Sequence, residues 1–147
     1  MKKQISRALL GLAAALALAV AAHAQTWRTV SIRVPFDFVA GEKRLPAGRY
    51  TVQRTKSDSE TALLIRSEDG RSSAVILTTT GALQPSSSAL VFRQHGDRYF
   101  LAAVSMPGTA SVRELPKAGA ERRLERELAE QNQTGESKTV TVVGSVK

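Results

Sequence analysis

The sequence predicts a mainly β protein, an antiparallel β-sandwich or small barrel of about six to eight strands with one C-terminal α-helix. Apolar and polar residues alternate in short runs between residues 29 and 104, and turns rich in glycine or proline separate these runs. The chain has no cysteine, so an apolar core rather than disulfides must hold the fold. A single helical pattern follows the alternating runs, at residues 117–131.

Residues 1–24 have the three parts of an export signal and would form an N-terminal signal helix. A basic start leads into an apolar run rich in alanine and leucine, and Ala22-His23-Ala24 fits the cleavage rule of signal peptidase. The apolar run, about 15 residues long, is shorter than the roughly 20 residues that a membrane span needs. We therefore expect cleavage after Ala24, a periplasmic or secreted product, and no transmembrane span after cleavage.

The remaining chain divides into a domain, a helix and a tail. We expect a β domain over residues 25–115, because all seven aromatic residues lie at or before Phe100. A C-terminal helix is expected over 116–133, and a loose tail or an edge strand over 134–147.

The first two strands are expected at residues 29–38 and 49–54. Val30, Ile32 and Val34 alternate with polar residues, which is typical of a strand that buries one face. Pro35 lies inside this run, and proline cannot donate to a sheet ladder. The strand should therefore lie at an edge, or be bulged or broken at this position.

Two hairpins are expected further along the chain. Asp69-Gly70 is a hairpin signal between apolar runs. The clearer hairpin covers residues 89–104, with Gly96-Asp97 as its loop, and its two apolar faces place it at the centre of a sheet. Counting back from that loop predicts the cross-strand pairs Gln94–Tyr99, Arg93–Phe100, Phe92–Leu101, Val91–Ala102 and Leu90–Ala103.

The predicted helix has a narrow apolar stripe, Ala120, Leu124 and Leu128. Glu121 and Glu125 lie one turn apart and form an unfavourable pair of like charges. Two leucines bury little apolar area, so the helix should either dock weakly or project from the domain.

The formal net charge is +8, and outside the signal the excess lies on the first strands. Residues 25–56 hold seven basic and two acidic residues, whereas residues 57–147 hold eleven of each. Such an excess can attract lipid headgroups or a polyanionic glycan. The candidate anion-binding residues are Arg33, Lys43, Arg44 and Arg49. A solvated, arginine-rich outer face explains the same residues without any ligand.

Motifs between Val34 and Leu115 resemble those of a group of small exported bacterial β proteins of uncharacterised function. They are Val34-Pro-Phe-x-Phe-x-x-Gly41, Leu45-Pro-Ala-Gly-x-Tyr-x-Val52, Gly96-Asp-x-Tyr-Phe-Leu and Arg113-Glu-Leu-Pro. The resemblance implies a small exported β protein and supplies no catalytic residues. His95 departs from the pattern of the group, in which an aromatic residue precedes the glycine.

The chain after residue 24 offers few groups for catalysis. Its single histidine, His95, would need Asp97 as a partner for Ser-His-Asp chemistry, and no Gly-x-Ser-x-Gly motif is present. The histidine and cysteine content is too low for a typical zinc site. The carboxylate pairs at 58–60 and 68–69 lack the spacing of a calcium loop. We therefore expect no enzyme activity, no metal and no cofactor.

The leading hypothesis is an exported, non-enzymatic β domain that serves in the cell envelope as an interaction or ligand-binding module. The first alternative is a binder of anionic glycan or lipid headgroups through the basic first strands. Two further alternatives are a small hydrolase using His95 and a barrel that holds a small apolar ligand. Export and the acidic residues interleaved after residue 57 argue against nucleic acid as the partner.

Overall fold

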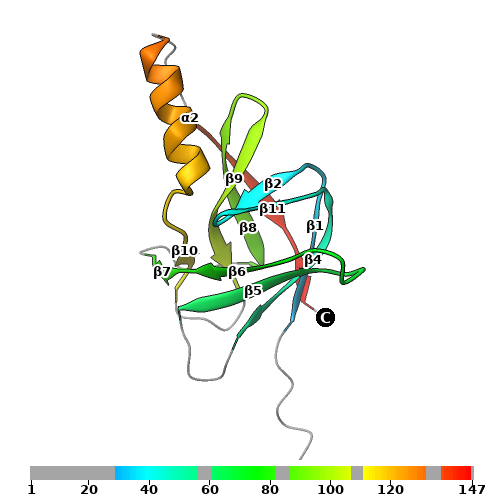
Figure 1. Ribbon diagram of the computed structural model, residues 1–147. Coiled ribbons are helices and arrows are strands. Elements are labelled where there is room, and N and C mark those ends of the chain that lie inside the picture. The colour runs from blue at the N-terminus through cyan, green and yellow to red at the C-terminus, as the bar shows by residue number, and fades with distance from the viewer. Residues whose placement is uncertain (1–28, 56–60, 82–86, 107–110, 132–136, 147) are drawn as a thin grey trace, which may run out of the picture.

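The computed structural model describes residues 29–55, 61–81, 87–106, 111–131 and 137–146 (Figure 1). The predicted signal peptide at 1–24 and the carboxylate pair at 58–60 lie outside these described residues. No helix within the described ranges has the length and apolar character that a membrane crossing requires.

The described chain forms two β-sheets with one helix beside them (Figure 1). The first sheet has the order β12-β1-β4-β5-β6, made of β1 (Val30–Val34), β4 (Gly48–Arg54), β5 (Ala62–Ser67), β6 (Ser73–Leu77) and β12 (Ser145–Val146). The second has the order β11-β8-β9-β10-β7, made of β7 (Thr79–Thr80), β8 (Ala89–His95), β9 (Arg98–Ser105), β10 (Arg113–Glu114) and β11 (Lys138–Val143). Strand β2 (Phe38–Ala40) joins the second sheet, in parallel with β9, and pairs on its other side with β3 (Lys43–Leu45).

This architecture confirms the predicted β-sandwich with one helix, and the described strands do not close into a barrel. Twelve strands are described, more than predicted, because the chain passes repeatedly from one sheet to the other. Strand β1 ends at Val34, and Pro35 begins the corner that leads to β2 in the second sheet. The chain also passes from one sheet to the other after β3, at Thr78 and at Gly144.

The core lies between the two sheets. Val30, Ile32 and Val34 of β1 are buried, as the alternation predicts for a strand with one inward face. The Phe38 ring connects the sheets: it lies edge-on to Tyr50 of the first sheet, at 5.2 Å between centroids, and to Phe92 of the second, at 5.3 Å. Edge-to-face contacts of this kind add specificity to apolar burial.

Strands β8 and β9 form the predicted hairpin, in the interior of the second sheet. The pairs Gln94–Tyr99, Arg93–Phe100 and Phe92–Leu101 are confirmed. The last two predicted pairs are wrong, because Val91 pairs with Ala103 and Leu90 with Val104. A β-bulge leaves Ala102 as an extra residue on β9 and shifts the register by one.

The helix, α2 (Gly119–Glu130), lies within the predicted range and stands beside the β8–β9 hairpin (Figure 1). The described part of the tail forms strands rather than a loose segment. Strand β11 pairs with β8 along its whole length, and Val140 and Val142 pack against the core. After Gly144 the chain enters the first sheet, where β12 pairs with β1.

Candidate anion-binding surface and the cluster under the helix

The outer face of the first sheet is the surface that this sheet turns away from the second. Because side chains alternate along a strand, this face carries the residues that lie between the buried ones. Its exposed charged and apolar members are Arg33 on β1, Arg49 on β4, Arg66 on β5, and Val75 and Leu77 on β6.

Two of the four predicted anion-binding residues meet on this face. Arg33 lies directly opposite Arg49 in the register of β1 and β4. The Cβ atoms of such cross-strand neighbours lie roughly 5 Å apart, so like charges there repel each other. Arg49 Nε is 3.4 Å from Glu68 Oε2, whereas Arg33 has no ion-pair partner among the described residues. The opposed arginines therefore keep a positive charge that one carboxylate does not neutralise.

The other two predicted residues lie elsewhere. Lys43 and Arg44 are exposed on β3, which belongs to the second sheet, and Arg44 Nη2 is 3.4 Å from Asp37 Oδ2. The basic residue that sequence reasoning missed is Arg66, which joins Arg33 and Arg49 on the outer face. The alternation of its own strand could have revealed it, because Arg66 follows the buried Ile65.

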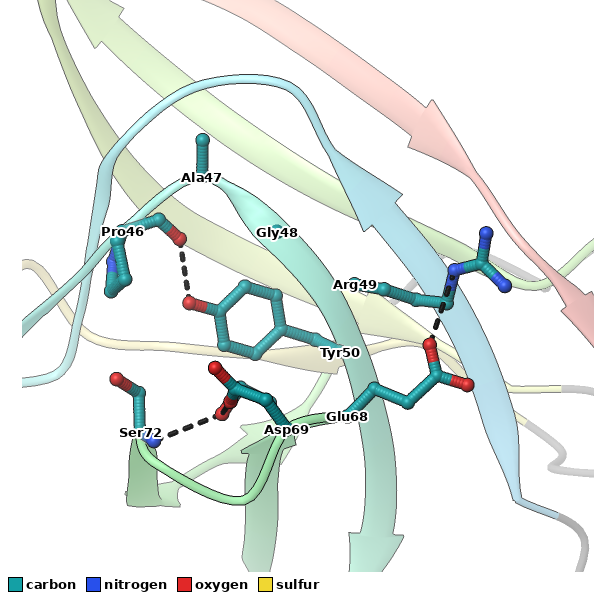
Figure 2. Close-up of a pocket in the computed structure, with 9 residues that line it drawn as sticks. Pro46, Ala47, Gly48, Arg49, Tyr50, Glu68, Asp69 and Ser72 are labelled. Atoms are coloured by element: carbon teal, nitrogen blue, oxygen red, sulfur yellow. Dashed lines mark hydrogen bonds and ion pairs between the residues drawn. The ribbon is translucent and has the colours of Figure 1, made fainter.

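A hollow of about 420 Å³ lies beside Arg49, between the turn before β4 and the turn after β5 (Figure 2). Tyr50 Oη donates to the Pro46 carbonyl at 2.6 Å, and burial, followed by the charges of Asp69 and Asp37, raises the pKa of this phenol. Asp69 Oδ1 accepts from Ser67 Oγ at 2.5 Å and closes its own turn. The polar groups at this hollow are thus used by the two turns, and its carboxylates disfavour an anion.

Glu68 and Asp69 both line this hollow (Figure 2). They are the carboxylate pair at 68–69 that lacks the spacing of a calcium loop. Glu68 pairs with Arg49, and Asp69 bonds within its turn, where the Ser67 hydroxyl and the Arg71 amide hold its pKa below the ordinary value. The two side chains therefore serve different partners and do not converge on one point.

A buried ionic cluster connects α2 to the second sheet. Glu121 is 0% exposed and accepts two hydrogen bonds from Arg93, from Nε at 2.6 Å and from Nη2 at 3.0 Å. His95 Nε2 lies 3.1 Å from Glu121 Oε1 and 3.6 Å from Glu125 Oε1. Lys117 Nζ is 2.7 Å from Glu125 Oε1. Glu121 is the only buried side chain of α2, and the predicted stripe of Ala120, Leu124 and Leu128 is half-buried.

The local periodicities of the two elements explain how the cluster forms. Arg93 and His95 are two residues apart on β8 and share the outer face of the second sheet. Glu121 and Glu125 are four residues apart and share one face of the helix. The helical pair that is unfavourable in isolation is therefore compensated by cations from outside the helix. Such an uncompensated acidic pair is the signal that could have located the cluster.

His95 is held in this cluster. The residue is 3% exposed, and its imidazole packs edge-on against the Phe100 ring, at 5.8 Å between centroids. An ionised carboxylate can only accept, so Nε2 donates to Glu121, and within the described part Nδ1 has no hydrogen-bond partner. Asp97, the expected catalytic partner, is exposed in the hairpin turn, and Glu121 faces the imidazole instead.

His95, Glu121 and Glu125 also have the composition of a metal-ligand set, and their ligand atoms lie within 4.8 Å of one another. Each carboxylate, however, already holds a cation, Arg93 or Lys117. A divalent ion would have to displace Lys117 and approach the Arg93 guanidinium. We therefore interpret this group as an ion-pair cluster that fastens the helix.

The cluster predicts a pH-dependent stability. Burial raises the pKa of the Glu121 carboxyl, but hydrogen bonds and charges from Arg93 and His95 outweigh it, and the net pKa lies below the ordinary 4.5. A carboxyl with a lowered pKa stabilises the fold while ionised, so this contribution is complete above about pH 5 and declines as the pH falls toward the folded-state pKa.

We expect the free energy of unfolding of the wild type to exceed that of Glu121→Gln by more above about pH 5.5 than below about pH 4.5. Urea denaturation of both proteins across this range measures the difference. A difference that does not change from about pH 3 to 7 would contradict the prediction.

No family model, curated protein or solved structure gives a significant match to this chain. The exported group that the motifs between Val34 and Leu115 resemble therefore stays a prediction.

Proposed function

We propose that the chain, once exported and cleaved, is a non-enzymatic interaction module that binds anionic groups through the outer face of the first sheet. The observation that carries this proposal is the opposition of Arg33 and Arg49, which among the described residues have only Glu68 as an ion-pair partner. An anion placed over this pair supplies the missing countercharge. Guanidinium groups suit the task, because they bind phosphate, sulfate or carboxylate through two parallel hydrogen bonds.

Two further observations support a binding role. The signal predicted at residues 1–24 would export the chain, and envelope polymers and lipids would then offer it anionic groups. The hydrolase alternative has less support, because the imidazole of His95 is buried and engaged by Glu121. A hydrolase would need this group to face a substrate.

The charge on the face favours an extended polyanion over a small ion. An arginine near an anionic surface contributes about 1 kcal/mol, so Arg33, Arg49 and Arg66 together give at most about 3 kcal/mol, because Glu68 offsets part of the charge of Arg49. Such an affinity is weak for a single ion but becomes effective on a polymer or surface that presents many anions. Because the interaction is electrostatic and exposed, it should weaken as the salt concentration rises.

We expect Arg33→Glu to weaken binding to an anionic polymer by roughly thirtyfold, since it lowers the charge of the face by two units of about 1 kcal/mol each. Stability should not fall, because the new glutamate lies opposite Arg49, where opposite charges are favourable by roughly 0.2–1 kcal/mol. The measurements are binding of the cleaved chain, residues 25–147, to a sulfated polysaccharide at low and high salt, together with urea denaturation.

Lys43→Glu is the matched control, because it makes the same charge change on β3 in the second sheet. Weakening by Arg33→Glu alone would support the outer face as the site. Equal weakening by both variants would mean that total charge governs binding and would contradict a local site. No weakening by either variant would overturn the proposal.

A further inference from the structure

We propose that the anionic partner of the outer face is the surface of a phospholipid bilayer; this inference rests on the proposed function. The same face carries two exposed aliphatic side chains on β6, Val75 at 62% and Leu77 at 69% exposure. Leu64 of β5 lies directly opposite Val75 and is half-buried on this face. The outer face therefore combines arginines whose charge Glu68 balances only in part with an apolar margin.

The strand register orders these residues along the face. Arg33 and Arg49 form the first row, and Arg66, opposite Thr51, lies in the next. Val75 and Leu64 follow, and Leu77 ends the series opposite Ala62. Each row adds about 7 Å, so the face changes from cationic to apolar within roughly 20 Å.

The sequence of strand β6 contains none of the residues that usually protect a sheet edge. It is the last strand of the first sheet, and its five residues, Ser73–Leu77, include neither a charge nor a proline. Exposed edges in soluble proteins are commonly protected by charged residues, proline or bulges. Single exposed aliphatic residues are ordinary, but two neighbours on an uncharged edge strand, beside arginines on one face, indicate a surface that meets an apolar partner.

A bilayer surface offers both anionic phosphates and, just below them, an apolar layer. Its phosphates can bind the arginines, while the acyl boundary a few ångströms deeper can accept Val75 and Leu77. A sulfated or carboxylated glycan in solution supplies only the anions and would leave the aliphatic side chains in water. The helix covers part of the outer face of the second sheet, through Arg93 and His95, whereas the arginines and aliphatics of the first sheet remain exposed.

The test replaces the aliphatic side chains without changing charge. We expect Val75→Thr/Leu77→Thr to reduce binding to vesicles of phosphatidylcholine with about one-third phosphatidylglycerol by about fivefold or more. Retention on the sulfated polysaccharide should not change, because the arginines are intact. The fold should be retained, since both side chains are exposed and threonine favours strands. Val143→Thr, a residue of similar exposure (65%) on β11 in the second sheet, is the matched control.

The outcomes distinguish a failure of the bilayer proposal from a failure of the proposed function. Selective loss of vesicle binding in the double variant supports the bilayer. Unchanged vesicle binding in the double variant, with Arg33→Glu still impaired, overturns the bilayer but leaves the anion-binding face. Unimpaired binding of Arg33→Glu to both vesicles and polysaccharide shows that the proposed function itself is wrong. A concentration-dependent dimer that the double variant abolishes, without vesicle binding, would assign β6 to a second copy and overturn the inference.

Discussion

Glu121→Ala is expected to lower the free energy of unfolding by about 3 kcal/mol and to release α2 from the second sheet. The substitution leaves the Arg93 guanidinium and the buried His95 imidazole without the acceptor that holds them. Breaking a buried ion pair on one side costs about 3–5 kcal/mol. The lower end applies here, because the Arg93 side chain is 21% exposed and can turn toward water.

Two measurements test this expectation. Urea denaturation gives the change in stability, and hydrogen exchange over residues 119–130 reports whether the helix alone opens. Glu127→Ala, on an exposed position of the same helix, is the control and should cost less than about 0.5 kcal/mol. Arg93→Ala/Glu121→Ala should cost less than the sum of its single variants, because it leaves no unpaired charge. Equal effects of Glu121→Ala and Glu127→Ala would contradict the role assigned to the cluster.

The cluster also explains the asymmetry between the two outer faces. Phe100 lies opposite Arg93 on the outer face of the second sheet, yet its ring is 2% exposed. The Phe100 ring packs edge-on against His95, which Glu121 of α2 holds in place, so we expect an undocked helix to increase the exposure of Phe100. The outer face of the first sheet depends on no such attachment among the described elements, which leaves its arginines and aliphatic side chains available to a partner.

The burial of the first strands could be predicted from sequence because each buries one face and therefore has a simple period of two. Val30, Ile32 and Val34 are buried as that period requires. The hairpin register could be predicted only from the loop to Phe92, where the bulge begins. The extra residue, Ala102, is apolar like its neighbours, so the pattern looks the same with or without the bulge.

The sequence pattern could predict only part of the candidate surface. The period of two places Arg33 and Arg49 on a polar face, but their direct opposition comes from the pairing of β1 with β4. Pro35 indicates that the first strand breaks, yet no residue indicates that the chain then enters the other sheet. This crossing carries Lys43 away from the arginines. Arg93 and Glu121 are 28 positions apart, and their meeting depends on tertiary structure that neither local period contains.

The second large effect is expected at Gly144, where the chain crosses from β11 in the second sheet to β12 in the first. The Gly144 amide donates to the Ser88 carbonyl at 2.8 Å and fixes the crossing point. A Cβ at this position would lie 2.9 Å from the Ser31 carbonyl oxygen and would also meet the Ile32 side chain. The backbone oxygen belongs to a paired strand and cannot move aside cheaply. Gly144→Ala should therefore lower the free energy of unfolding by about 2 kcal/mol.

A matched substitution and a truncation test the cause of that loss. Gly48→Ala is the control, because its Cβ would lie 3.6 Å from the Tyr50 ring, an ordinary contact, and should cost less than about 1 kcal/mol. Gly144→Ala should not lower the free energy of unfolding by much more than deletion of residues 145–147 does, if the substitution acts by forcing β12 away from β1. In the truncated chain residue 144 is free to turn outward, so the same substitution should cost less than about 1 kcal/mol. An equal loss of stability in the full and the truncated chain would mean that the strain lies on the β11 side of the crossing. That result would contradict a clash that depends on the pairing of β12 with β1.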